Sequence, residues 1–169
     1  QLIRQHRQRA SRDYADFAFL KDAAAARLAD RLELIRRDFD LCLDLGAHDG
    51  RLAQHFAQHF AQNSGQDPGA DSAGSGKIGH MIQSDPAVGF ALAAANYGSG
   101  IVHALDQLPY KAESFDAVVS CLSLHWVDDV PGLMMQARRL LKPDGLLLMS
   151  LLGGNSLIEL RQVLAEAEQ

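Results

Sequence analysis

The residues with the clearest chemistry lie in residues 41–50, which read LCLDLGAHDG. An apolar run ends in Asp44, and Gly46 and Gly50 follow before the helix-like stretch RLAQHFAQHFAQ. Glycines let the backbone bend sharply and approach a ligand closely, and the free N–H groups of a following helix attract an anion. Asp44 is expected at the carboxyl end of a strand, where ligands enter parallel sheets. The stretch therefore predicts a nucleotide-binding strand–turn–helix unit.

The glycine spacing distinguishes between two kinds of ligand. A dinucleotide site reads GxGxxG for a pyrophosphate, whereas an S-adenosylmethionine site reads DxGxGxG for an amino-acid carboxylate and ammonium. Asp44, Gly46 and Gly50 fit the second spacing, and His48 stands where the middle glycine is expected. The alternative is a structural turn without a ligand, because short motifs of this kind also occur by chance.

Acidic residues follow three successive predicted strands, at Asp44, Asp85 and Asp106. Parallel strands bring their carboxyl ends to one edge of the sheet, so the three side chains are expected along one rim. An acid after the second strand commonly accepts hydrogen bonds from ribose hydroxyls, which makes Asp85 the ribose candidate. Asp106 is either an acceptor for an adenine amino group or an ordinary turn residue.

The elements that must position these acids alternate between strands and helices. Strands are predicted at about 39–44, 77–84, 101–105, 115–122 and 146–152, and helices over 17–35, 50–62, 88–96, 131–141 and from 156 to the end. This alternation predicts an α/β fold with a Rossmann-like, doubly wound parallel sheet and right-handed crossovers. In the first of these helices the expected buried stripe is Phe19, Leu20, Ala24, Leu28, Leu32 and Ile35.

Length and composition indicate one domain. A chain of 169 residues, 47% of them hydrophobic, is long enough for one real core and too short for two. We divide this single domain, 1–169, into an N-terminal helical segment over 1–38, a body, and a loop insertion over 63–76 that has almost nothing to bury and is expected to be flexible. Because the chain lacks an initiator Met and stops at Gln169 in a helical pattern, we expect its C-terminal part to be missing.

Charge and hydropathy narrow the expected partners. A net charge of −5 argues against nucleic acid, although arginines cluster in the first 12 residues. No apolar stretch reaches membrane-spanning length and no signal core is present, so we expect a cytoplasmic chain without a membrane span. Cys42 and Cys121 lie in apolar runs and are expected to be buried thiols. His55 and His59 are spaced i, i+4 without a third ligand nearby, so no metal site is expected.

Several segments together resemble class I S-adenosylmethionine-dependent methyltransferases. They read RQRASRDYADFAFLKD, LDLGAHDG, the acid at Asp85, LPYKAESFDAVVSCLSLHWVDDVPG and RRLLKPDGLLLMSLLGGNSLIELR, and they cover nearly the whole chain. The pattern is most similar to the branch of the mitochondrial complex I assembly factor 5 family and its bacterial relatives, next to the biotin-pathway malonyl-carrier-protein methyltransferases. The resemblance implies S-adenosylmethionine as cofactor and a small-molecule or protein acceptor, with a respiratory-complex subunit or a carrier protein as candidate partners.

The resemblance also implies roles for individual residues. His125 and Trp126 match the segment that faces the substrate, and His125 is the candidate base for a protonated nucleophile because its ordinary pKa is near neutrality. Backbone bonding by His125 and core packing by Trp126 are the alternatives. The resemblance further implies a set of residues at the cofactor. In chain order they are a closing aromatic, the methionine-end loop, the ribose acid with its neighbour, the adenine contacts and the end of the fourth strand: Tyr14, Asp44, Gly46, Ala47, His48, Gly50, Asp85, Pro86, Asp106, Gln107, Leu108, Cys121 and Leu122.

Two departures from the family pattern leave other functions open. His48 replaces the middle glycine, and the sequence ends before the antiparallel strands that this class places after the fifth strand. The alternative function is therefore a non-catalytic assembly or binding module, or an assembly factor of the arginine-hydroxylase kind, on the same fold. A nicotinamide-dependent dehydrogenase is the third hypothesis.

Overall fold

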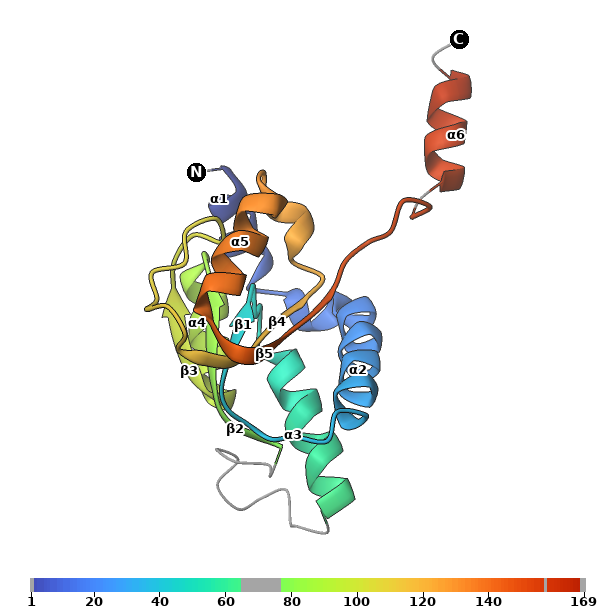
Figure 1. Cartoon of the computed structure of the whole chain (residues 1–169). Helices are drawn as coiled ribbons and strands as arrows, with labels where there is room; N and C mark the ends of the chain where they lie inside the picture. Colours follow the sequence, from blue (N-terminus) through green and yellow to red (C-terminus); the bar gives the residue numbers. More distant parts are fainter. Residues whose placement is uncertain (1, 65–76, 157, 168–169) are drawn as a thin grey trace.

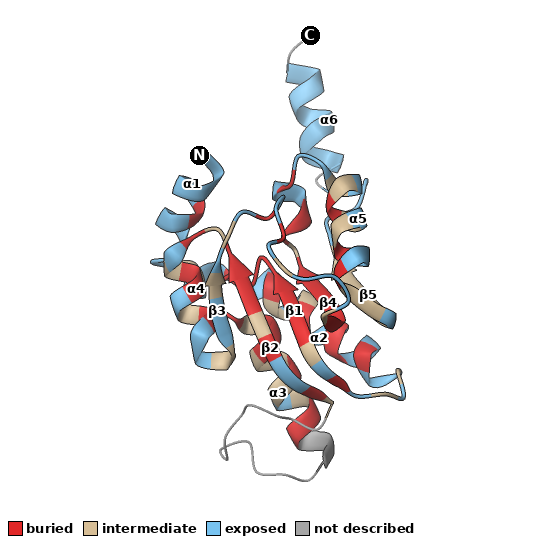
Figure 2. Ribbon diagram, turned by 60° about the vertical axis from the view of Figure 1, so that its left-hand side comes forward, coloured by how far each residue is buried: buried red, intermediate tan, exposed pale blue. Residues whose placement is uncertain are grey.

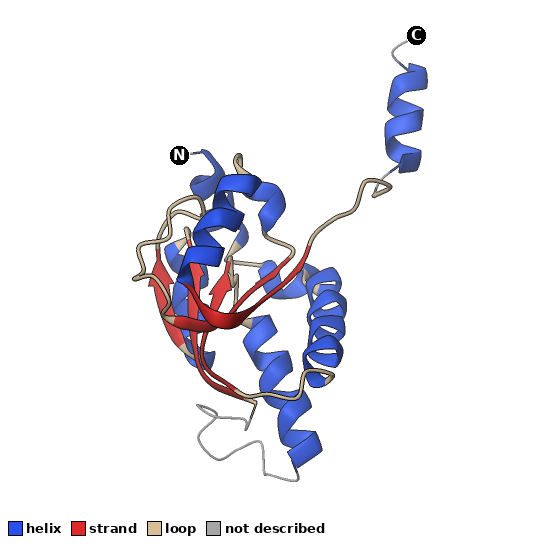
Figure 3. Ribbon diagram, in the orientation of Figure 1, coloured by secondary structure: helices blue, strands red, loops and turns tan. Residues whose placement is uncertain are grey.

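A computed structural model describes residues 2–64, 77–156 and 158–167. In these residues one five-stranded sheet, with every pairing parallel, has the order β3-β2-β1-β4-β5 (Figure 3). The chain winds outward from β1 first in one direction and then in the other, which makes β1 and β4 the switch point where such sheets bind ligands. The α/β, doubly wound prediction is confirmed. The strands are β1 (Phe39–Leu45), β2 (Ile78–Asp85), β3 (Ser99–Val102), β4 (Phe115–Cys121) and β5 (Leu141–Ser150).

Helices cover both faces of the sheet (Figure 2). Helices α2 (Phe19–Glu33) and α3 (Arg51–Ser64) pack on one face, and α5 (Val130–Leu140) packs on the other. Helix α4 (Val88–Ala94) and the short η2 (Ala95–Tyr97) lie along β2 and β3. Helix α1 (Leu2–Ala10) contacts α4 and, with η1 (Tyr14–Phe17), approaches the carboxyl ends of the strands.

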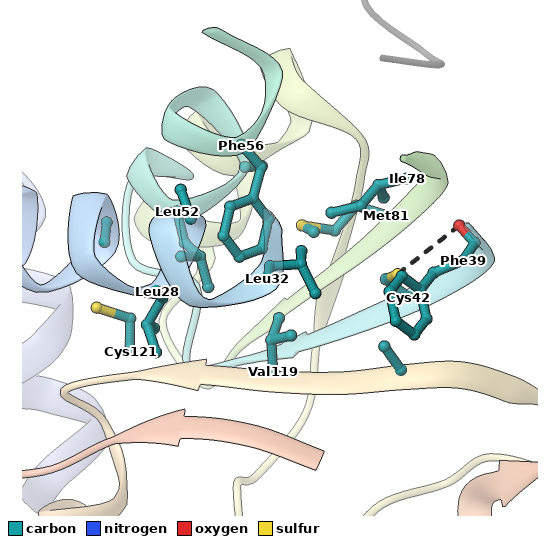
Figure 4. Close-up of a cluster of buried hydrophobic side chains, with 14 of the residues drawn as sticks. Leu28, Leu32, Phe39, Cys42, Leu52, Phe56, Ile78, Met81, Val119 and Cys121 are labelled. Atoms are coloured by element: carbon teal, nitrogen blue, oxygen red, sulfur yellow. Dashed lines mark hydrogen bonds between the residues drawn. The ribbon is translucent and has the colours of Figure 1, made fainter. Parts of the chain in front are cut away.

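Two hydrophobic clusters, one on each face, hold these layers together. Figure 4 shows the first, in which Leu32 of α2 and Phe56 of α3 meet Phe39 and Val119 of the sheet. The second joins β1, β4 and β5 to α5. Because β4 is buried along its whole length, it belongs to both clusters. The thiols of Cys42 and Cys121 are free and buried, as the sequence predicts.

The structure corrects the predicted stripe of α2. Phe19 and Leu20 are 77% and 50% exposed, whereas the buried positions begin at Lys21 and continue through Ala25 and Leu28. Small alanines on this face let α2 approach the sheet and α3 closely. The prediction was wrong at the start of the helix because it chose the largest apolar residues, while contacts with the turn after β1 select Lys21.

Strands β3 and β5 also begin earlier than predicted. β3 starts at Ser99 because Gly100 fits against α4, where a Cβ would lie 2.1 Å from the Ala91 carbonyl oxygen. β5 starts at Leu141, and its register with β4 shifts between Phe115 and Ala117. Such a bulge accommodates Pro143, because proline has no N–H to donate to a neighbouring strand. The sequence had placed Pro143 before the strand.

The C-terminal helix α6 (Ile158–Ala167) stands apart from the body of the molecule (Figure 1), and its described side chains are exposed. β5 is an edge strand of the sheet, and in the described residues no antiparallel pair follows it. Of the predicted loop 63–76, the first two residues complete α3 and the rest lies outside the described residues. Within the described ranges, no helix is long and apolar enough to cross a bilayer.

Packing predicts very different mutational effects in α3 and α6. Phe56 is 1% exposed, so Phe56→Ala should lower the free energy of unfolding by about 3–5 kcal/mol through lost burial and a cavity. Leu160 of α6 is 51% exposed, so Leu160→Ala should change it by less than about 0.5 kcal/mol. Urea denaturation followed by circular dichroism measures both, and equal losses would contradict the described position of α6.

Candidate functional site

Backbone hydrogen bonds hold the glycine turn after β1 against β2. The N–H groups of Gly46 and Ala47 both donate to the Ser84 carbonyl oxygen, at 2.9 and 3.0 Å. Gly46 and Gly50 have φ angles of +74° and +84°, which L side chains rarely adopt. A Cβ on Gly46 would also lie 2.4 Å from the Cβ of Ser123. The turn therefore requires glycine at both positions.

Asp44 lies fully buried near the end of β1, and neither of its carboxylate oxygens has a hydrogen-bond partner. Burial raises the pKa of Asp44 to about 6; Lys21 opposes this shift, and the carboxylate of Asp85 adds to it. A buried carboxylate without a partner is costly unless a cation with N–H donors reaches it. Asp44 is therefore suited to receive a positively charged donor.

His48 fills the position at which the motif has its middle glycine. Its φ of 54° is left-handed backbone, which costs a non-glycine residue about 1–2 kcal/mol. Three contacts offset this cost: the His48 N–H donates to Asp85 Oδ2 at 3.1 Å, Nδ1 lies 2.8 Å from the Gly46 carbonyl oxygen, and the ring stacks on Tyr14 with centroids 4.9 Å apart. The imidazole therefore occupies space that a glycine would leave open.

Helix α1 covers the second acid through Arg7, whose side chain is 3% exposed. Arg7 donates through Nε and Nη2 to the two carboxylate oxygens of Asp85. The same carboxylate accepts from the N–H groups of His48 and Ala87, so its four acceptor positions are filled. The predicted ribose acid is thus satisfied within the protein, and a ribose would have to displace Arg7 from at least one oxygen.

Asp106 lies on a more exposed part of the same rim. Gln136 of α5 fixes this loop by donating to the Asp106 carbonyl oxygen at 2.8 Å and accepting from the Leu108 N–H at 3.1 Å. The Leu108 N–H that was predicted to contact adenine is therefore already bonded, and the Gln107 N–H donates to Ala104. A cavity of about 230 Å³ adjoins this loop, lined by Ile3, Arg4, Pro86, Ala104, Leu105, Asp106, Trp126, Val127 and Asp128. Its mixed apolar and polar lining suits a flat base.

Four other predicted residues surround this rim. Tyr14 of η1 closes over His48, whereas Cys121 is buried under α2 and burial raises the pKa of its thiol. Leu122 lines a groove between α2 and β5. His125, on η3 (Leu124–Trp126), is exposed, and partial burial and the charge of Arg7 lower its pKa, so it is neutral near pH 7. Roles for these residues at a cofactor stay predictions.

The two histidines considered for metal binding, His55 and His59, have structural partners. His55 Nε2 lies 3.1 Å from Asp22, and His59 Nε2 lies 2.8 Å from Glu33. Both pairs connect α3 to α2. In the part of the chain that the structure describes, no group of three metal-ligating side chains comes together.

Two buried basic side chains complete the site, and the sequence reasoning missed both. Arg7 appeared only as one of several arginines near the N-terminus. Lys21 of α2 is 2% exposed, and its Nζ lies 3.1 Å from the Gly46 and Ala47 carbonyl oxygens and 2.6 Å from His48 Nδ1. The available signal was helical spacing: Lys21 precedes the buried Ala25 by four residues, and a charged side chain on a buried stripe needs a partner.

The sheet order, the glycine turn and the rim acids together define the class I S-adenosylmethionine-dependent methyltransferase fold. Comparison with known families agrees with this class, because a methyltransferase domain matches residues 6–168. The chain belongs to that methyltransferase family, whose cofactor is S-adenosylmethionine. The unpartnered carboxylate of Asp44 beside a glycine turn fits the ammonium group of such a cofactor.

Individual relatives place the chain more narrowly. It is 36% identical over 159 residues to the mitochondrial arginine-hydroxylase NDUFAF5 of Mus musculus, covering 92% of this chain and 41% of that protein. It is 46% identical over 61 residues to a malonyl-[acyl-carrier protein] O-methyltransferase of Xylella fastidiosa, covering 36% of this chain and 21% of that protein. The chain thus spans about two fifths of the length of the NDUFAF5 relatives.

A solved structure shows the same fold. A putative S-adenosyl-L-methionine-dependent methyltransferase of Methanococcus maripaludis aligns with a TM-score of 0.65 and 15% identity, covering 95% of this chain and 69% of the other. The NDUFAF5 and malonyl-carrier-protein relatives, for their part, confirm the predicted resemblance to those branches.

The buried pair of Arg7 and Asp85 should make α1 part of the cooperative fold. Arg7→Met leaves a buried carboxylate without its cation and should lower the free energy of unfolding by about 3 kcal/mol. Arg9→Met, at an exposed position of the same helix, should change it by less than about 0.5 kcal/mol. Urea denaturation of the two variants tests this difference, and similar values would contradict the buried ion pair.

Asp44 should make stability depend on pH in an unusual direction. Its folded pKa of about 6 lies above the unfolded value, so the native state holds more protons between the two values and stability falls as pH rises through this window. Asp44→Asn removes this titration. The stability of Asp44→Asn relative to the wild type should therefore rise by about 2 kcal/mol between pH 4.5 and 7.5. Urea denaturation at both pH values measures the difference, and a constant difference would contradict the raised pKa.

Proposed function

We propose that this chain binds S-adenosylmethionine along the rim of Asp44, Asp85 and Asp106 and transfers its methyl group to an acceptor at the mouth of the site. The observation that carries the proposal is the fully buried carboxylate of Asp44, which has no hydrogen-bond partner and adjoins a turn that needs glycine. Asp44 would hold the ammonium group of the cofactor. Asp85 would hold the ribose once Arg7 withdraws, and the cavity beside Asp106 would hold the adenine.

The residues of the chain would act mainly by positioning and by excluding water. The bound cofactor supplies a methyl group on a sulfonium, which is already activated for displacement. Tyr14, stacked on His48, would close the site from the N-terminal side. His125 is exposed, and its lowered pKa keeps the ring neutral near pH 7. It would therefore be free to take a proton from a methyl acceptor that enters in its protonated form.

The candidate acceptors are suggested by the relatives rather than by the site. A malonyl-carrier-protein methyltransferase and NDUFAF5 proteins are both similar to this chain, so a carrier-protein carboxylate and a respiratory-complex subunit are the first acceptors to test. A small metabolite is the third. A cytoplasmic location fits the carrier protein, whereas the NDUFAF5 relatives are mitochondrial.

Arginine hydroxylation in an assembly factor is the second candidate function. It is favoured by the relatives that cover 92% of this chain and carry the name arginine-hydroxylase. A fold of this class does not itself determine the reaction, because function depends on the site. Mass spectrometry of the acceptor distinguishes the two candidates, since one adds CH₂ and the other adds oxygen.

Isothermal titration tests the cofactor assignment. The wild-type chain should bind S-adenosylmethionine and S-adenosylhomocysteine. Asp44→Asn should lower the affinity for both compounds by roughly 30-fold, because a charge-assisted hydrogen bond is lost. Asp40→Asn is the matched control, since the same substitution is made at an exposed position near the other end of β1. If the wild type binds neither compound, the proposal fails and a binding module becomes the better interpretation.

Isotope-labelled cofactor tests the reaction. With a labelled methyl group on S-adenosylmethionine, label should enter the candidate acceptor in the presence of the wild type and much less with His125→Ala. An arginine that gains the mass of one oxygen and carries no methyl label would instead support hydroxylation.

A further inference from the structure

We propose that Lys21 binds the α-carboxylate of the cofactor, and that it is a neutral amine in the free protein and takes up a proton when the cofactor binds. This inference rests on the proposed function and assigns a ligand and a proton to its methionine end. Lys21 lies fully buried beside the glycine turn, and its hydrogen bonds reach Gly46, Ala47 and His48 but no carboxylate.

The first step is the tautomer of His48. Arg7 Nη1 lies 3.2 Å from His48 Nε2, and a guanidinium can only donate. Nε2 must therefore accept, which places the single proton of the neutral ring on Nδ1. The Gly46 carbonyl oxygen, 2.8 Å from Nδ1, agrees with this assignment because it can only accept. Burial and the charge of Arg7 lower the pKa of His48, so the ring is neutral.

The second step is the state of Lys21. Its Nζ lies 2.6 Å from His48 Nδ1, and an ammonium there would set N–H against N–H. A neutral amine has one lone pair and two N–H groups. The lone pair shares the Nδ1–H with the Gly46 carbonyl oxygen, and the two N–H groups donate to the carbonyl oxygens of Gly46 and Ala47, each at 3.1 Å. Every hydrogen-bonding position of a neutral Lys21 is thus used once.

The surrounding charges agree with a neutral lysine that can be recharged. Burial lowers the pKa of Lys21, Arg7 lowers it further, and the acidic groups oppose this. An anion added beside Nζ would shift the balance toward the ammonium. The titratable and charged groups that face Lys21 from the packed elements are Arg7 of α1, Asp44 of β1, His48 of the turn, Asp85 of β2 and Cys121 of β4.

Asp44 and Lys21 together match an amino-acid end group. The Asp44 carboxylate has no donor, and Lys21 does not bond to it, yet each influences the pKa of the other. An α-amino acid carries an ammonium and a carboxylate on one carbon; the ammonium is the donor that Asp44 lacks, and the carboxylate is the anion that would recharge Lys21. Cofactor binding would bring the ammonium to Asp44 and the carboxylate to Lys21, with the added proton coming from solvent. The third N–H of Lys21 would then turn to the carboxylate, and the His48 Nδ1–H would keep only its bond to the Gly46 carbonyl oxygen.

Two ligands separate this role from a structural one. S-adenosylhomocysteine carries the amino-acid end, and 5′-methylthioadenosine lacks it. In isothermal titration, Lys21→Met should lower the affinity for S-adenosylhomocysteine by roughly 30-fold. Its affinity for 5′-methylthioadenosine should stay within about twofold of that of the wild type. Lys111→Met, at an exposed position away from the site, is the control and should change neither affinity.

Proton uptake is measured by titration in buffers of different ionisation enthalpy near pH 8, where Asp44 is ionised. Binding of S-adenosylhomocysteine to the wild type should take up about one proton more than binding to Lys21→Met. The wild type should take up none with 5′-methylthioadenosine. This comparison of two ligands on the wild type requires no variant to fold.

The possible outcomes are distinct. Equal weakening of both ligands by Lys21→Met would mean that Lys21 only supports the turn, and no weakening would remove it from the site; either result overturns the assignment. Absence of extra proton uptake by the wild type overturns the neutral state. A wild-type chain that binds neither ligand would refute the proposed function itself, whereas one that binds both ligands equally would refute only the role of Lys21.

Discussion

The structure depends on keeping charges at the carboxyl ends of β1 and β2 out of water. Asp44 and Asp85 are fully buried there, and the buried basic side chains of Arg7 and Lys21 reach the same place from two N-terminal helices. Burial of a charge is tolerated only when its hydrogen-bonding groups are satisfied, and this condition is met for Asp85 and left open for Asp44. The satisfied Asp85 attaches α1 to the sheet, and the open Asp44 is where we propose that a ligand binds.

This arrangement couples the N-terminal segment to the site. Helix α1 is a short, mostly polar helix, and Arg7 is its buried residue, so an ion pair rather than an apolar face attaches it to the sheet. Helices of this length are marginal by themselves, and tertiary contacts supply most of their stability. A ligand that binds Asp85 would therefore compete with the ion pair between Arg7 and Asp85 that attaches α1. Opening of the site and release of α1 would then be the same conformational equilibrium.

His48 shows how the turn accepts a residue that the glycine pattern does not anticipate. A left-handed backbone is strained for histidine, but the ring stacks on Tyr14 and bonds within a network of Arg7, Gly46 and Lys21. The turn has therefore not lost its geometry; it has acquired side-chain contacts that a glycine could not make. The class I fold supports more than one reaction, so such local chemistry and not the sheet order decides what the domain does.

The sequence by itself determined the parallel α/β sheet, the glycine turn and the acids at the strand ends, because hydrophobic periodicity and turn chemistry are local properties of neighbouring residues. It misplaced the buried stripe of α2 and the starts of β3 and β5, where packing against α4 and a bulge beside β4 override local preference. Only the tertiary structure decided that Arg7 and Lys21 belong to the site, since their partners lie 78 and about 25 residues away. A charged residue in a helix reads as solvent-exposed until the fold brings an acid or a carbonyl oxygen to it.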